Sequence, residues 1–340
     1  MKRVFTFLVF VLCFADCIAL AIKPSRTIEL SVFAPKATEC DGSRVLYPNS
    51  SVWINDQNLV VWLISTCGSH DPHKRKSFSV LVFINSDGKA QVLQRPETLL
   101  RISRGPAGTL LVGHGAIVDL IEPNLHVEQS IECPDKNLCA VFPSPSGSDE
   151  SDFALCSIVS STEHCDLFKG LPAARLPERG MNFPAQERGI PKDPYQVALT
   201  KAVSAWPDSP YARAWRVSEN ELWYFDRHGV LTNSIAGRSL APVSSEQWTP
   251  KDSACTGEVS AFKPMRFLAT CVGTHFYTDG DLDAIFGYSR IALFDVTSKQ
   301  KLTSINGPVD ATAALSPGGG RIAVIHRGRV KIWLNLYEVD

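Results

Sequence analysis

The chain has 340 residues, of which 44% are hydrophobic and 20% are charged, and its formal net charge is −1 at pH 7. The apolar content excludes an intrinsically disordered chain, because it is sufficient to form a large buried core. The balanced charge gives no support to nucleic acid or an anionic membrane as a partner, since both attract strongly basic surfaces.

Residues 1–21 have the pattern of a secretory signal peptide. Two basic residues precede an apolar stretch at 4–14, and Ala19-Leu20-Ala21 matches the small-x-small pattern of a cleavage site. We expect cleavage after Ala21, a secreted or periplasmic location, and no membrane span in the remaining chain. An uncleaved anchor is disfavoured because the apolar stretch has about half the length that crosses a bilayer. A lipid anchor through Cys17 is disfavoured because an acid precedes that cysteine.

The first strand expected after the signal is RTIELSVFA at residues 26–34, which has no hairpin partner before Cys40. At the other end, residues 314–339 read as two or three short strands joined by tight turns. The last of these strands would leave an open edge, and open edges promote aggregation. We therefore expect the strand between Thr27 and Phe33 to pair with the C-terminal strands and to close the fold.

Four segments share one pattern, in which an apolar strand, a polar residue and a tight turn are followed by an alternating strand. This pattern predicts a β-hairpin at each of residues 80–94, 116–131, 221–235 and 291–305. We expect the polar side chain at each turn to accept hydrogen bonds from nearby backbone amides, which is a structural role. These polar residues are Asn85, Glu122, Asp226 and Asp295.

Further apolar strands that follow small turns lie upstream of several hairpins, at 260–273 and 313–326 and, more loosely, at 99–115 and 139–159. Together with the hairpins they give units of four strands that recur about every 40 residues, as in β-propellers. Several strands are apolar without alternation, which indicates cover on both faces. We expect residues 22–340 to form an all-β, single β-propeller of six or seven four-stranded blades. A pair of β-sandwiches is the alternative.

The C-terminal segment resembles a blade of the WD-repeat propellers and of related bacterial secreted propellers. Ser316-Pro317-Gly318-Gly319 matches the turn before an apolar strand, and Ile332-Trp333 matches the end of the strand that follows. Leu334 stands where the Trp-Asp dipeptide of that family has Asp. The resemblance implies a propeller fold and leaves open which partners the chain has.

Eight cysteines remain after the predicted signal, and an even number in an exported chain indicates disulfides. No C-x-x-C motif occurs after residue 21, so a zinc ribbon and a thioredoxin-like pair have no support. We expect near neighbours to pair. The expected pairs are Cys156 with Cys165, Cys255 with Cys271, Cys133 with Cys139, and Cys40 with Cys67.

Residues 171–194 are rich in Pro, Arg and Gly and predict an irregular insert that overlies one propeller face. A short helix is expected at 195–204. Three tryptophans, Trp206, Trp215 and Trp248, interrupt loop-like sequence and are candidates for stacking against a peptide or a sugar. The alternative is that they pack between blades.

Three carboxylates alternate in a predicted loop at Asp279, Asp281 and Asp283. Such an arrangement can direct oxygen ligands at calcium, although Ala284 and Arg290 depart from the EF-hand pattern. A solvated acidic loop is the alternative. Histidines at 70, 73 and 275 lack the converging ligand set that a transition metal needs. We expect no cofactor beyond this calcium hypothesis.

No sequence signature of a hydrolase, a metalloprotease or a nucleotide-binding enzyme is present, so no catalytic residue is identified. We therefore expect an exported monomeric propeller that acts as a binding or scaffold module for a protein, peptide or glycan ligand. The alternative is a propeller hydrolase or lyase that acts on an extracellular polymer, with the acids at 279, 281 and 283 near its channel.

Overall fold

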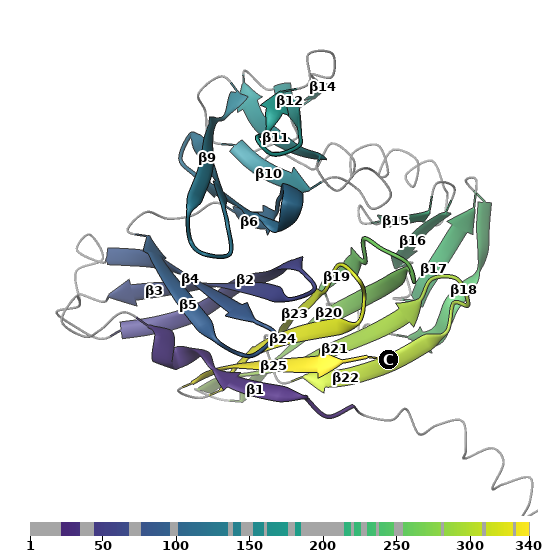
Figure 1. The fold of residues 1–340 in the computed structure, drawn as a ribbon. Coiled ribbons are helices and arrows are strands. Elements are labelled where there is room, and N and C mark those ends of the chain that lie inside the picture. The colour runs from purple at the N-terminus through teal and green to yellow at the C-terminus, as the bar shows by residue number, and fades with distance from the viewer. Residues whose placement is uncertain are drawn as a thin grey trace, which may run out of the picture.

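The structure is a computed structural model, and it describes sixteen stretches of the chain. These are residues 22–34, 44–67, 76–95, 101–134, 139–143, 152–159, 162–175, 181–184, 214–218, 221–225, 230–235, 238–247, 254–279, 282–307, 311–328 and 331–339. Every regular element among them is a strand or a short 3-10 turn, so the predicted all-β fold is confirmed (Figure 1). No helix in these stretches is long and apolar enough to cross a membrane. The helix expected at 195–204 lies outside them.

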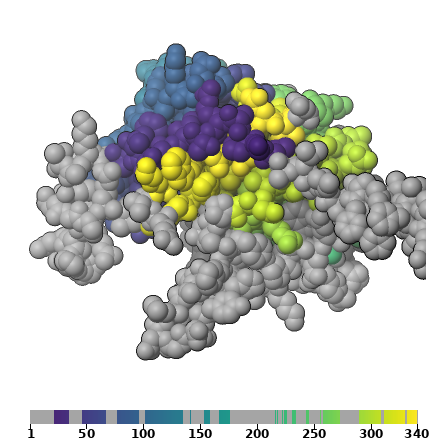
Figure 2. Space-filling model, turned by 90° about the horizontal axis from the view of Figure 1, so that it is seen from below, coloured from purple at the N-terminus to yellow at the C-terminus, as the bar shows by residue number. Residues whose placement is uncertain are grey.

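The first and last strands of the described chain share one four-stranded sheet, which we call the seam sheet. Its order is β1 (Arg26–Glu29), β25 (Ile332–Glu338), β24 (Arg321–Arg327) and β23 (Thr312–Leu315). Figure 2 shows, from below, the N-terminal residues lying across the C-terminal strands. The predicted pairing between the two ends of the fold is therefore present. It is shorter than predicted, because residues 30–33 leave the strand as a 3-10 turn, η2 (Leu30–Phe33).

Five further antiparallel sheets lie between these ends, and four of them have four strands in sequence order. The first two contain β2 (Arg44–Asn55), β3 (Asn58–Cys67), β4 (Lys76–Asn85) and β5 (Ala90–Arg95), then β6 (Arg101–Arg104), β7 (Leu110–His114), β8 (Ile117–Ile121) and β9 (Val127–Glu132). A 3-10 turn, η5 (Pro106–Gly108), joins β6 to β7. The last two contain β15 (Ala214–Ser218), β16 (Glu221–Phe225), β17 (Val230–Ile235) and β18 (Arg238–Gln247), then β19 (Ala254–Val259), β20 (Arg266–Asp279), β21 (Leu282–Asp295) and β22 (Lys301–Gly307).

The remaining sheet lies between these two pairs in chain order and has five strands. It contains β10 (Cys139–Pro143), β11 (Asp152–Val159), β12 (Thr162–Lys169), β13 (Ala174–Arg175) and β14 (Met181–Pro184). Both β13 and β14 pair with β12, at opposite ends of that strand. Parts of the segment 171–194 therefore extend a sheet edge, where an irregular insert was expected.

All four predicted hairpins are present, as β4–β5, β8–β9, β16–β17 and β21–β22. Asn85 Oδ1 accepts a hydrogen bond from the amide of Lys89 at 2.9 Å, and Asp295 Oδ1 accepts one from the amide of Ser298 at 2.6 Å. These two polar residues thus have the structural role that the sequence predicts. Glu122 differs, because its carboxylate accepts from the side chain of Asn124, and Asp226 lies outside the described residues.

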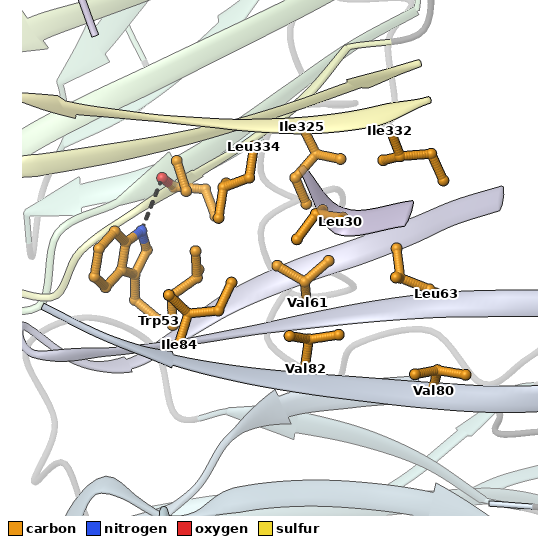
Figure 3. Close-up of a cluster of buried hydrophobic side chains, with 13 residues drawn as sticks. Leu30, Trp53, Val61, Leu63, Val80, Val82, Ile84, Ile325, Ile332 and Leu334 are labelled. Carbon is orange, nitrogen blue, oxygen red and sulfur yellow. Dashed lines mark hydrogen bonds between the residues drawn. The ribbon is translucent and has the colours of Figure 1, made fainter. Parts of the chain in front are cut away.

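Apolar side chains fill the space between successive sheets. One cluster joins the seam sheet to the β2–β5 sheet, and Figure 3 shows Leu30, Val61 and Ile325 meeting within it. Two similar clusters lie on either side of the β6–β9 sheet, one against the β2–β5 sheet and one against the β10–β14 sheet. Two more lie on either side of the β19–β22 sheet, one against the β15–β18 sheet and one against the seam sheet. Strands covered on both faces explain the apolar runs, such as residues 59–63, which are all buried.

Candidate functional site

One edge strand of each sheet, which we call its first strand, contacts the first strand of at least one neighbouring sheet. In the seam sheet the first strand is β23, at the edge opposite β1. Contacts join β2 to both β6 and β23, β10 to β6, and β19 to both β15 and β23. Each of these strands pairs within its own sheet on one side only, so its other edge carries unpaired backbone groups. The ends of these six strands are therefore a place where polar groups from different sheets can meet.

Side chains from the neighbouring sheets bond to β23 from both sides. The amide of Ser316 donates to the carbonyl of Arg321 at 2.9 Å, so the amide of residue 315 points away from β24. That amide donates to Glu258 Oε2, on β19, at 2.8 Å. From the other side, Trp53 Nε1, on β2, donates to the carbonyl of Ala314 at 3.2 Å (Figure 3). Three sheets are joined at this point.

Glu258 has a strongly perturbed acidity. Burial between the strands raises the pKa of its carboxyl from 4.5 to about 7, against the lowering effects of the Leu315 amide and of the positive charge of Arg104. Arg104 is the last residue of β6, in a sheet that does not neighbour the sheet of Glu258. Glu258 is the residue before the last in β19, so each of the two lies at the C-terminal end of its strand. We call Glu258, Arg104 and the Leu315 amide the strand-end site.

Turns around the strand-end site are held to one another by polar contacts. Arg321 Nη1 donates to the carbonyl of Asp56 at 2.7 Å, and the amide of Gly318 donates to Asp56 Oδ1 at 2.7 Å. Arg266 Nη1 donates to the carbonyl of Gly319 at 2.9 Å. A Cβ on Gly318 would lie 2.7 Å from the Asp56 carboxylate, so glycine allows this close approach. The Ser-Pro-Gly-Gly turn therefore links its own sheet to both neighbours.

A second polar cluster surrounds Asp119, a buried acid on β8. Its Oδ2 contacts Arg95 Nη2 at 2.9 Å and His114 Nε2 at 2.9 Å, and its Oδ1 accepts from Ser130 Oγ at 2.6 Å. Ser130 bonds to the acid and not to the histidine, so this is not the serine-histidine-acid chain of hydrolases. Because Arg95 ends β5, the cluster joins the β2–β5 sheet to the β6–β9 sheet.

The predicted calcium ligands lie at the tip of a long hairpin. Asp279 ends β20, and Asp283 lies in β21 opposite Thr278. Asp281 lies outside the described residues, as do the side chains of the other two acids. Among the residues that are described, no group of three or more potential metal ligands is present. The calcium site stays a prediction.

Trp215 is the only one of the three candidate tryptophans within the described residues. Its ring lies 5.4 Å from that of Phe267 and 5.9 Å from that of Phe225, measured between ring centroids. Trp215 therefore packs between the β15–β18 and β19–β22 sheets, which is the alternative that the sequence offered. Trp206 and Trp248 lie outside the described residues, and ligand binding by these tryptophans stays a prediction.

One predicted disulfide, between Cys255 and Cys271, is present and joins β19 to β20. Cys133 and Cys156 are also disulfide-bonded. Cys156 lies directly opposite Cys165 in the β11–β12 pair, as the predicted bond requires. The remaining predicted partners have side chains outside the described part of the chain, at Cys40, Cys67, Cys139 and Cys165.

No protein-family model and no curated protein sequence matches the chain. Among solved structures, the WD40 domain of Neurospora crassa Pan2 is 9% identical with a TM-score of 0.40, and the match covers 93% of this chain and 95% of that domain. The AfRom2 CNH domain is 8% identical with a TM-score of 0.45, and the match covers 88% of this chain and all of that domain. TolB from Acinetobacter baumannii is 12% identical with a TM-score of 0.33, covering 77% of this chain and 60% of TolB.

Proposed function

We propose that the chain is an exported β-propeller of six blades, closed at the seam sheet, which binds a protein, peptide or glycan at the strand-end site. The order of packing supports a ring, because each sheet with a described neighbour packs against the next sheet along the chain. The seam sheet then brings the last blade against the first. The first strands, which contact one another from sheet to sheet, correspond to the inner strands of a propeller.

The observation that carries the binding proposal is the state of Arg104. Its side chain is half-buried, and within the described residues it forms no hydrogen bond and no ion pair. Arginine that is partly removed from water is normally paired, because its five donors are costly to desolvate. A ligand that supplies acceptors at the strand-end site would satisfy these donors.

Export is supported by two features of different kinds. The first 21 residues have the pattern of a signal peptide. The Cys255–Cys271 disulfide is of a kind that persists mainly in proteins of oxidising compartments. The proposal requires the exported protein to begin at or near Ile22. Intact-mass measurement of protein recovered from the medium or periplasm tests this, and a mass that retains residues 1–21 contradicts it.

The binding proposal is tested with arrays of peptides and of glycans, probed with the wild-type protein and with an R104Q/E258Q double variant. We expect wild-type binding to a restricted set of array members, and loss of that binding in the double variant. The matched control is R101Q, which changes another arginine of β6 and is expected to bind as the wild type does. Binding that survives in the double variant contradicts the proposal.

A hydrolase or lyase acting on an extracellular polymer is the second candidate, and Glu258 is the observation that favours it. A carboxyl group with a pKa near 7 can hold a proton at neutral pH and donate it to a leaving group. Depolymerisation of a panel of polysaccharides and proteins, compared between the wild type and E258Q, decides between the two functions. Turnover that E258Q abolishes would establish the enzyme.

A further inference from the structure

The strand β2 contains the triplet Asn49-Ser50-Ser51, which has the pattern Asn-x-Ser/Thr and occurs once in the sequence. Transferases of the eukaryotic secretory pathway recognise this pattern and attach an oligosaccharide to its asparagine. The export that we propose would bring the chain into contact with such a transferase. A stable modification also requires a fold that leaves the asparagine side chain in solvent.

Asn49 lies at a register shift between β2 and β3. Pro48 is opposite Leu63, whereas Ser50 is opposite Trp62, so Asn49 is an extra residue with no partner on β3. Such an extra residue departs from the regular ladder, as in a β-bulge. The side chain of Asn49 is exposed, while those of Pro48 and Ser50 are half-buried. A glycan on Asn49 would therefore leave the pairing of β2 with β3 intact.

The part of β2 that carries Asn49 extends beyond the neighbouring strand of the seam sheet. Trp53 Nε1 donates to the carbonyl of Ala314 at 3.2 Å, which places these residues at about one level. Further along both segments, the amide of Gly318 donates to Asp56 Oδ1 at 2.7 Å, so β2 and β23 run side by side in the same direction. The strand β23 starts two residues before Ala314, whereas Asn49 lies four residues before Trp53. The asparagine therefore lies beyond the start of β23, which agrees with its exposure.

Ser51 determines when the modification can take place. The transferase must reach the hydroxyl of Ser51 as well as the amide of Asn49, because both belong to the recognised pattern. In the fold, Ser51 pairs with Val61 on β3, and its Oγ is buried. The folded protein therefore cannot present the complete triplet. The oligosaccharide has to be attached while the chain enters the secretory pathway unfolded, and the exposed Asn49 can retain it after β2 has formed.

We propose that Asn49 is an N-glycosylation site, modified before the chain folds. The donor is an oligosaccharide linked to a lipid through a pyrophosphate. The amide nitrogen of Asn49 forms a bond to the anomeric carbon of the first sugar, and the bond from that carbon to the pyrophosphate oxygen breaks. The amide loses one proton and the lipid pyrophosphate leaves, so nothing is oxidised or reduced. This inference rests on the export in the proposed function and goes beyond the proposed binding role.

A glycan on Asn49 would lie away from the strand-end site. Asn49 is six residues before Asn55, the last residue of β2, which is about 20 Å along an extended strand. The strand-end site lies at the C-terminal ends of the first strands β6, β19 and β23. The modification therefore leaves that site accessible, and we expect enzymatic removal of the glycan to leave array binding unchanged.

The test expresses the full chain, with its own residues 1–21, in cultured eukaryotic cells and recovers the protein from the medium. Mass spectrometry measures the intact protein before and after treatment with peptide N-glycosidase. We expect most of the secreted protein to lose the mass of one oligosaccharide. The enzyme converts a glycosylated asparagine to aspartate, so peptide masses then show whether Asn49 was the modified residue. Secreted protein that lacks residues 1–21 and carries no oligosaccharide on Asn49 overturns the proposal.

Four variants separate the triplet from other causes. N49Q and S51A should both be secreted without the oligosaccharide, whereas S51T keeps the pattern and should carry it. S51A should fold, because it removes a buried hydroxyl that makes no hydrogen bond within the described part of the chain. The matched control is N124Q, which changes an exposed asparagine outside any such triplet and should be modified as the wild type is. An oligosaccharide that persists in N49Q or in S51A overturns the proposal.

The order of modification and folding has its own test. Folded protein without the glycan, produced in a bacterial periplasm, is incubated with purified transferase and the lipid-linked donor. We expect no transfer to the folded wild type, and transfer to a synthetic peptide of residues 44–55 under the same conditions. Equal transfer to the folded protein and to the peptide would contradict modification before folding.

The outcome is separable from that of the proposed function. A chain that stays in the cells with residues 1–21 attached contradicts the proposed export, and a second chain, in which a well-characterised signal peptide replaces those residues, then tests Asn49 by itself. Glycosylation of this second chain supports the site even though export by residues 1–21 has failed. A wild type that is secreted, cleaved and unmodified contradicts the site and leaves the proposed export intact.

Discussion

The hydroxyl of Thr27 donates a hydrogen bond to Oδ1 of Asn335 at 2.8 Å, which joins β1 to β25 through their side chains. Nearby, the amide of Ile332 donates to Ser31 Oγ at 2.8 Å, and Lys331 pairs with Glu29 at 2.8 Å. The contact between the two ends of the fold is therefore made by backbone pairing, side-chain hydrogen bonds and an ion pair. It also has an apolar component, because Leu30 lies in the cluster beneath the seam.

Replacing Leu30 by alanine should destabilise the fold by about 2–5 kcal/mol, the usual cost of removing a fully buried leucine side chain. Leu30 has 0% exposure, whereas Val32 in the same 3-10 turn is 66% exposed. V32A is therefore a matched control, with an expected change within about 0.5 kcal/mol. Urea unfolding measures both variants. Equal stability of L30A and the wild type would show that the seam does not support the fold.

The raised pKa of Glu258 makes the free energy of unfolding depend on pH. The folded state binds the proton more tightly than the unfolded state, so the stabilisation is complete below about pH 4.5 and is lost as pH rises through about 7. E258Q keeps an acceptor for the Leu315 amide and cannot ionise. We expect E258Q to gain on the order of 1–3 kcal/mol over the wild type between pH 5 and pH 8. Urea unfolding at several pH values measures this, and parallel curves for the two proteins would contradict it.

Removing the carboxylate of Asp119 should be costly, because Arg95 and His114 would lose the buried acceptor that they share. For D119A we expect a loss of about 3–5 kcal/mol, as for other broken buried ion pairs. The control is E128A, on the neighbouring strand β9 at an exposed position. Thermal unfolding of the two variants provides the comparison. A D119A protein as stable as E128A would remove the structural role that we assign to the cluster.

If the acids at 279, 281 and 283 bind calcium, the wild type should melt at a higher temperature with millimolar calcium than with a chelator. Binding of a ligand to the folded state alone raises stability in this way. The triple variant D279N/D281N/D283N should melt at one temperature under both conditions, and magnesium serves as the control ion. A wild type that responds to neither calcium nor chelator excludes the calcium site.

Much of the fold can be predicted from the sequence because its signals are local. Turn residues such as Asn85 and Asp295 act within their own hairpins, and the near-neighbour rule identified the Cys255–Cys271 bond. The seam is also predictable, since an unpartnered N-terminal strand and an open C-terminal edge each require the other. The exact length of β1 cannot be predicted from the sequence, because the strand ends where the 3-10 turn directs Leu30 into the core.

The candidate site could not be predicted in the same way. Glu258 and Arg104 belong to different sheets, and only the packing of first strands places them together. A local signal exists for Asp119, because an acid inside the apolar strand IVDLI is unusual, but its partners come from three other strands. Two of the residues that the sequence suggested as ligand-binding lie within the described chain. Trp215 packs between two sheets, and Asp279 lies at the tip of a hairpin.

A crystal structure of the protein secreted without residues 1–21 tests the central claim most directly. We predict six blades around one axis, with β1 paired to β25 and with Arg104 and Glu258 facing each other at the same end of that axis. A ring with a different number of blades, an N-terminal segment that leaves β25 unpaired, or Arg104 and Glu258 at opposite ends of the axis would contradict the account.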